Sequence, residues 1–162
     1  MNTSQESNAK KSKNTYTKFI VMLAGSFIAM YITMYLNTYS IDHVYFSLTR
    51  LYMTCLGIAA MSLIMFFTMR KMYKNRKKNI AIVLGSIILF VSALGFVRVQ
   101  KPIVEDVLWM KAMIPHHSIA ILTSERAAIK DPEVKQLAED IIEAQRREIG
   151  EMKAMINRLE NK

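Results

Sequence analysis

Two adjacent histidines, His116 and His117, stand out first, because the chain has only three histidines in total. Met113 and Met110 stand four and seven positions before His117, and this spacing places the three side chains on one helical face. Thioether and imidazole groups together suit copper, especially Cu(I). The spacing therefore predicts a soft-metal site in this part of the chain.

A second helix is predicted to face these donors. Asp131, Pro132 and Glu133 form a helix start, with an N-cap, a proline at N1 and an acid in the first turn. Counting outward from the turn gives three facing pairs, which are His117 with Gln145, Met113 with Glu148, and Met110 with Met152. The predicted metal ligands are His116, His117, Met113, Met110 and Met152, with Gln145, Glu148 and Met155 as accessory residues.

A structural interpretation of the same residues stays open. Methionine and leucine interchange readily in cores, so a methionine stripe can be packing alone. The alternative is a non-metal membrane interaction or oligomerisation module with a structural His-His pair. We do not expect an enzyme, because the chain has no Glu-x-x-His repeat, no phosphate-binding glycine loop and no nucleophile elbow.

Three uncharged apolar runs dominate the first hundred residues, and each is about long enough to cross a membrane as a helix. They predict a disordered cytoplasmic tail (1–17) and a three-helix transmembrane region (18–98) with helices at about 19–36, 51–69 and 80–97. The remainder, residues 99–162, is predicted to be a separate domain outside the cytoplasm. The predicted class is therefore all-α.

The distribution of charge predicts the orientation. Residues 1–100 hold 12 basic and 2 acidic residues, a net of +10, whereas residues 101–162 hold 10 basic and 11 acidic, a net of −1. The basic residues flank the apolar runs, so we expect a lipid bilayer rather than nucleic acid as the partner. The first loop, residues 37–44, has no lysine or arginine. Positive-inside logic then predicts a multi-pass protein of the cell (inner) membrane, with a cytoplasmic N-terminus and an extracytoplasmic or periplasmic C-terminal domain.

The outer segment is predicted to form an antiparallel helical hairpin, with helices at about 102–129 and 132–160. Pro102 suits the first turn of the first helix, and Pro115 should kink it just before the histidines. One hairpin cannot cover its own apolar surface, so we expect a homodimer that completes a four-helix bundle.

A longer motif is carried by Asp106-x-x-Trp109-x-x-x-Met113-Ile114-Pro115-His116-His117-x-x-Ala120-Ile121, followed by Ile141-Ile142-x-x-Gln145-x-x-Glu148-Ile149-x-x-Met152. Over roughly residues 103–160 this motif resembles the domain-of-unknown-function 305 family. The resemblance implies an extracytoplasmic copper-binding protein with a helical, ferritin-like domain. By position it carries the ligand role to His116, His117, Met113 and Met152.

The chain departs from this pattern at Thr123, where members commonly have a methionine, so one soft ligand is absent. Taken together, the residues and the resemblance predict a membrane-anchored protein of copper binding or homeostasis. Copper, with a preference for Cu(I), is the expected cofactor, and another soft metal is the alternative.

Overall fold

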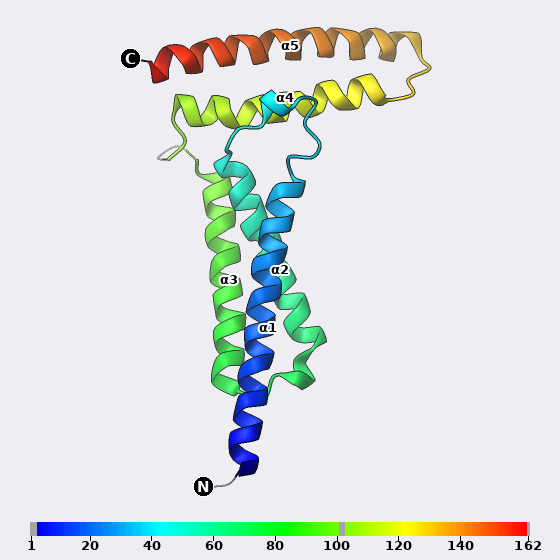
Figure 1. Cartoon of the computed structure of the whole chain (residues 1–162). Helices are drawn as coiled ribbons and strands as arrows, with labels where there is room; N and C mark the ends of the chain where they lie inside the picture. The colour runs from blue at the N-terminus through cyan, green and yellow to red at the C-terminus, as the bar shows by residue number, and fades with distance from the viewer. Residues whose placement is uncertain (1–2, 101–102, 162) are drawn as a thin grey trace. The chain divides into compact units, whose positions relative to one another are not determined.

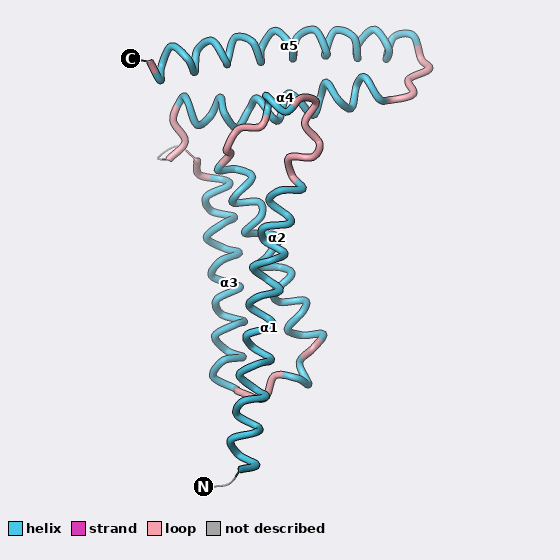
Figure 2. Tube along the Cα trace, viewed as in Figure 1, coloured by secondary structure: helices cyan, strands magenta, loops and turns pink. Residues whose placement is uncertain are grey.

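The computed structural model describes residues 3–100 and 103–161, and within them all regular secondary structure is helical, with no strand (Figures 1 and 2). The helices are α1 (Thr3–Thr33), α2 (Leu48–Thr68), α3 (Arg76–Arg98), α4 (Asp106–Arg126) and α5 (Pro132–Glu160), with short 3₁₀ turns η1 (Ile41–His43) and η2 (Arg70–Met72). The predicted all-α class is confirmed.

The chain divides into two compact units. The three-helix unit combines the chain up to Tyr31 with Leu51–Val99, and therefore holds most of α1 together with α2 and α3. The two-helix unit combines the segment Ile32–Arg50, which holds the end of α1, η1 and the first residues of α2, with the chain from Gln100 onward, and therefore holds α4 and α5.

The three-helix unit carries large apolar side chains on its surface. Residues 14–33 of α1, together with α2 and α3, are long and apolar enough to span a membrane. Large apolar side chains face outward, and Ile20 and Ile88 are each 65% exposed. Contiguous apolar surface of this kind is rare on proteins that face water. The unit is consistent with a multi-pass membrane protein, and each predicted run overlaps one of these three helices.

Buried aromatic residues fix one end of this unit. The Tyr16 hydroxyl donates a hydrogen bond to Asn79 Oδ1 (2.7 Å) and accepts one from the Asn75 backbone N–H (3.0 Å). Asn75 also caps α3, because its side chain accepts a hydrogen bond from the Lys78 backbone N–H (3.1 Å). The beginning of the apolar stretch of α1 and the beginning of α3 therefore lie together at the same end of the unit.

The observed start of α1 differs from the predicted one. The helix begins at Thr3, where a disordered segment over residues 1–17 was expected; residues 1–2 lie outside the described part. Residues 3–24 contain no glycine or proline. Without a helix breaker, the polar segment continues the helix of the apolar stretch that follows it.

In the two-helix unit, α4 packs against α5 through a shared core. Met110, Ile114 and Ile121 of α4 are buried against three residues of α5, which are Ile149, Met152 and Ile156. Asp131 caps α5 as predicted, since its carboxylate accepts hydrogen bonds from the Glu133 and Val134 backbone N–H groups (both 3.0 Å).

The bounds of α4 differ from the predicted 102–129. The helix begins at Asp106 and ends at Arg126, and Pro102 lies outside the described residues. Pro115 is buried inside α4, which continues past it to Arg126. Proline lacks the N–H that would bond one turn back, so tertiary packing on both sides of Pro115 must hold this part of the helix.

Candidate metal site

His117 is held by contacts to both of its ring nitrogens. Nδ1 lies 3.0 Å from the Met113 carbonyl oxygen, one turn earlier in α4. A carbonyl can only accept a hydrogen bond, so Nδ1 carries the proton and donates it. Nε2 lies 2.8 Å from Glu148 Oε2 on α5, and the His117 side chain is only 15% exposed. The backbone contact thus fixes the ring and directs Nε2 toward α5.

The pairing across the helices differs from the predicted register. His117 faces Glu148 in place of Gln145, which is half-buried one turn away. The prediction assumed that every residue up to the turn advances by the helical rise. However, Ala127 and Asp131, at the two ends of the link between α4 and α5, have extended backbones. Extended residues advance about twice as far as helical ones, which moves the partner of His117 toward the C-terminus of α5.

Three predicted thioether ligands gather in one place. Met110 and Met152 are buried in the core shared by α4 and α5, at 4% and 7% exposure, and Met113 packs against that core half-buried. Met113 also provides the carbonyl that holds His117. Met113 precedes His117 by one helical turn and Met152 follows Glu148 by one turn, so these side chains belong to the same stretches of α4 and α5 as the His117–Glu148 pair.

Other predicted site residues lie apart from this group. His116 is exposed, and its ring centroid is 6.2 Å from that of His117. Met155 is 43% exposed and lies outside the core cluster. Among residues 3–100 and 103–161, no three His, Cys, Asp or Glu side chains are grouped so that they could hold a metal ion.

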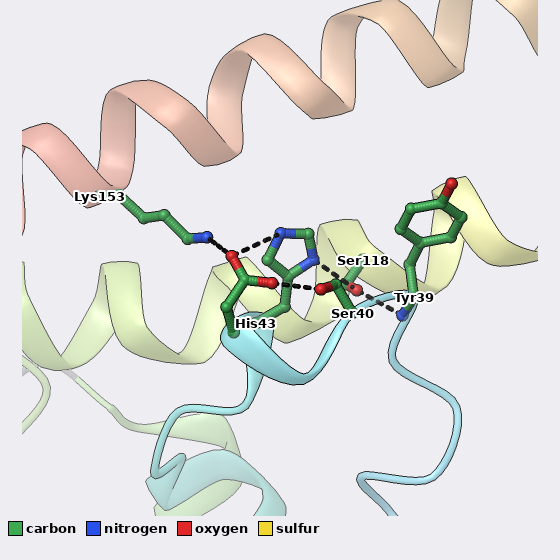
Figure 3. A network of polar contacts seen from close by, with 6 residues as sticks. Tyr39, Ser40, His43, Ser118 and Lys153 are labelled. Carbon is green, nitrogen blue, oxygen red and sulfur yellow. Dashed lines mark hydrogen bonds and ion pairs between the residues drawn. The ribbon is translucent and has the colours of Figure 1, made fainter.

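A polar network that the sequence did not predict joins the first loop to both helices (Figure 3). His43 Nδ1 lies 2.9 Å from Ser118 Oγ, and the Tyr39 backbone N–H donates to the same oxygen (2.7 Å). Asp42 forms an ion pair with Lys153 of α5 and accepts a hydrogen bond from Ser40. Ser118 immediately follows His117 and is fully buried, so the loop is held next to the candidate site.

Burial and nearby charges determine the protonation states of His43 and Asp42 in this loop. Burial, reinforced by the positive charge of Lys153, lowers the pKa of His43, while Asp42 acts in the opposite direction. The hydrogen bonds from Lys153 and Ser40 lower the pKa of Asp42 to about 2. Near neutral pH, Asp42 is therefore ionised and His43 is neutral.

A second tie joins the loop to the helices through Arg146. Its guanidinium contacts Glu125 of α4 at 2.5 Å, donates to the Tyr39 hydroxyl (3.3 Å) and lies 5.5 Å from the centre of the Tyr39 ring. The one sequence signal for this loop was Asp42-His43, an ionisable pair in a segment without lysine or arginine.

Comparisons with known proteins place this chain in a family. The model of the family described as "Domain of unknown function (DUF305)" matches residues 104–162, which contain the candidate site. No solved structure matches the chain. "Uncharacterized protein L153" of Acanthamoeba polyphaga mimivirus is 35% identical over 148 residues, which cover 88% of this chain and 95% of that protein. The chain therefore belongs to the same family as this viral protein, with a DUF305 domain at residues 104–162.

Proposed function

We propose that the protein is a membrane-anchored copper-binding protein whose two-helix unit is an antiparallel, ferritin-like hairpin outside the cytoplasm. The observation that carries this proposal is His117, whose Nδ1 is held by a backbone carbonyl while Nε2 points at Glu148, with three methionines packed in the core that the same two helices share. The proposed ligands are His117, Met113, Met110 and Met152, with His116 in support and Gln145, Glu148 and Met155 as accessory residues.

The chemistry of these donors fits copper. Imidazole and thioether ligands favour Cu(I), whereas carboxylate suits harder ions. His117 must present a free Nε2 lone pair to bind a metal, so its contact with Glu148 has to open. Glu148 would then be a neighbour of the bound ion. The proposed function is copper binding or homeostasis, without catalysis.

A second candidate is a purely structural role for the same residues, in an interaction or oligomerisation module. The 2.8 Å contact of His117 with Glu148 and the burial of Met110 and Met152 support it, because both are complete without a metal. The two candidates predict different copper affinities when methionine is replaced by leucine, which has a similar volume but no sulfur.

The test is a copper titration in detergent. It uses the full chain, because the segment Ile32–Arg50 is part of the two-helix unit. Replacing Met113 and Met152 together by leucine nearly conserves volume and should preserve helicity. We expect Cu(I) affinity, measured by competition with a chromophoric chelator, to fall by at least tenfold and Zn(II) affinity to change less. Met72→Leu, in the exposed turn η2, is the matched control. Equal losses of both metals, or no loss of either, would favour the structural role.

A further inference from the structure

A cavity in the three-helix unit combines a cationic mouth with an apolar interior. It has a volume of about 520 Å³ and is lined by residues of α1, α2 and α3. Tyr16, Thr17 and Lys78 line it at the end where the apolar stretch of α1 and α3 begin, and Leu23, Gly85 and Leu89 line it farther along these helices. Its volume lies within the range of about 300–1,000 Å³ typical of ligand sites.

The length of the cavity suits one lipid leaflet. Along α3 it extends from Lys78 to Leu89, which is about 16 Å at the helical rise of 1.5 Å per residue. This is about half of the roughly 30 Å hydrocarbon core of a bilayer. The deep polar groups need no ligand, because the Ser86 hydroxyl donates a hydrogen bond to the Ser62 hydroxyl (2.8 Å).

The positive charge of Lys78 at the mouth favours an anionic ligand. Lys78 is exposed, and its ammonium lies 4.9 Å from the centre of the Tyr16 ring. Residues 70–78 carry six lysines and arginines, and residues 43–104 contain no aspartate or glutamate. A second copy of this chain in the same membrane orientation would bring its own basic residues to this end, so it is a poor occupant. Basic pockets between membrane helices suit anionic lipid headgroups.

We propose that this cavity binds one anionic phospholipid, with an acyl chain between α1, α2 and α3 and the headgroup phosphate at Lys78. The site is separate from the metal site, and its existence does not depend on copper binding. The order of groups along the cavity, with the cation first and apolar residues beyond it, matches the order of groups in the lipid.

Native mass spectrometry of the full chain tests this proposal, with palmitoyl-oleoyl phosphatidylglycerol and phosphatidylcholine offered separately in mixed micelles. We expect one retained phosphatidylglycerol, favoured over phosphatidylcholine by about fivefold, because one lysine attracts a headgroup of net negative charge more than a headgroup whose phosphate is balanced by choline. Lys78→Gln should remove this preference. Lys74→Gln is the matched control, because Lys74 lines a different cavity between α2 and α3.

Filling the cavity with a larger side chain tests whether an acyl chain binds there. Gly85→Leu should reduce retention of both lipids, whereas Gly95→Leu, on the same helix but outside the cavity, should not. A Cβ at either glycine meets no atom within 4 Å, so Gly85→Ala provides a smaller version that the fold accommodates. Equal retention of the two lipids, equal effects of the two lysine variants, or equal effects of the two leucine variants would overturn the proposal. So would a lipid-free dimer that Gly85→Leu dissociates, which would assign the cavity to a second copy.

Discussion

His116 and His117 are neighbours in the chain but have different surroundings. His117 contacts Met113 and Glu148 and is mostly buried, whereas His116 is exposed. We expect His117→Gln to lower the free energy of unfolding of the metal-free protein by about 1 kcal/mol, because Glu148 loses its partner. His116→Gln should change it by less than about 0.5 kcal/mol.

Thermal melts of the full chain in detergent, followed by circular dichroism, measure this difference. For a chain of this size, about 1 kcal/mol corresponds to a shift of roughly 2–4 °C in Tm. Glu148→Gln keeps a hydrogen-bond acceptor and should lie between the two histidine variants. Identical melting temperatures for the two histidine variants would contradict the asymmetry.

At this scale the sequence predicted the placement of Met110, Met113 and His117 better than the residues that they contact. Helical spacing alone was enough to place Met110, Met113 and His117 on one face, because side-chain direction follows from the helical period. The partner of His117 depended on the conformation of five link residues, which spacing does not determine. The role of His43 depended on contacts between residues 75 apart in the chain, and no local pattern encodes such contacts.

Among the structural elements, we expect the segment Ile32–Arg50 to depend most clearly on pH. Its His43 has a pKa lowered by burial, so the folded state favours the neutral ring. The stability that this provides is fully present above the ordinary pKa of about 6.5 and is lost as the pH falls from there through the lower folded value. The Asp42–Lys153 pair titrates only at much lower pH, because the pKa of Asp42 is about 2.

We therefore expect the contact of the loop with Ser118 to weaken between pH 7.5 and pH 5.5 while the Asp42 contact persists. Hydrogen exchange at the Tyr39 amide, which donates to Ser118 Oγ, reports this change after correction for the intrinsic rate. His43→Gln should remove the pH dependence of that protection. Unchanged protection of the wild-type amide at the two pH values would refute the prediction.

The helices themselves were largely predictable. Apolar runs of membrane-spanning length located α2 and α3, and the Asp131-Pro132-Glu133 start located α5, because these signals are local. The start of α1 was not predictable from composition, since polar residues without a helix breaker can extend a helix that an apolar stretch stabilises. The end of α4 was missed because nothing in residues 127–129 marks a stop.

For the whole molecule, the charge distribution supports a topology with the N-terminus inside and the C-terminus outside. We expect a reporter that is active only in the cytoplasm to be silent when fused after Lys162 and active when fused before Met1. A fusion within the basic segment 70–78 should also be active and serves as an internal control. Cytoplasmic activity after Lys162 would exclude the proposed orientation.

The outer face of α5 carries exposed apolar side chains that the expected homodimer would cover. Leu137, Val134 and Met155 are 58%, 49% and 43% exposed. Two copies could cover these side chains by forming a four-helix bundle, and a metal that binds only the folded state would stabilise the pair. We expect the full chain in detergent to sediment as a dimer that Leu137→Glu dissociates and Cu(I) strengthens. Gln136→Glu, an exposed neighbour with the same change in charge, is the control; a wild-type monomer with and without Cu(I) would refute the dimer.

The two-helix unit is built from two separate stretches of the sequence, and this has a consequence for biosynthesis. Asp42 and His43 leave the ribosome early, but their partners Lys153 and Ser118 follow 111 and 75 residues later. At about 5–20 residues per second, Asp42 waits roughly 6–22 s for Lys153 to be made. The loop must remain available during this time, while α2 and α3 are synthesised, and it can dock only onto helices that are made after them. Completion of this unit therefore follows translation of α5, and a truncation within α5 would leave an early-made segment without its partner.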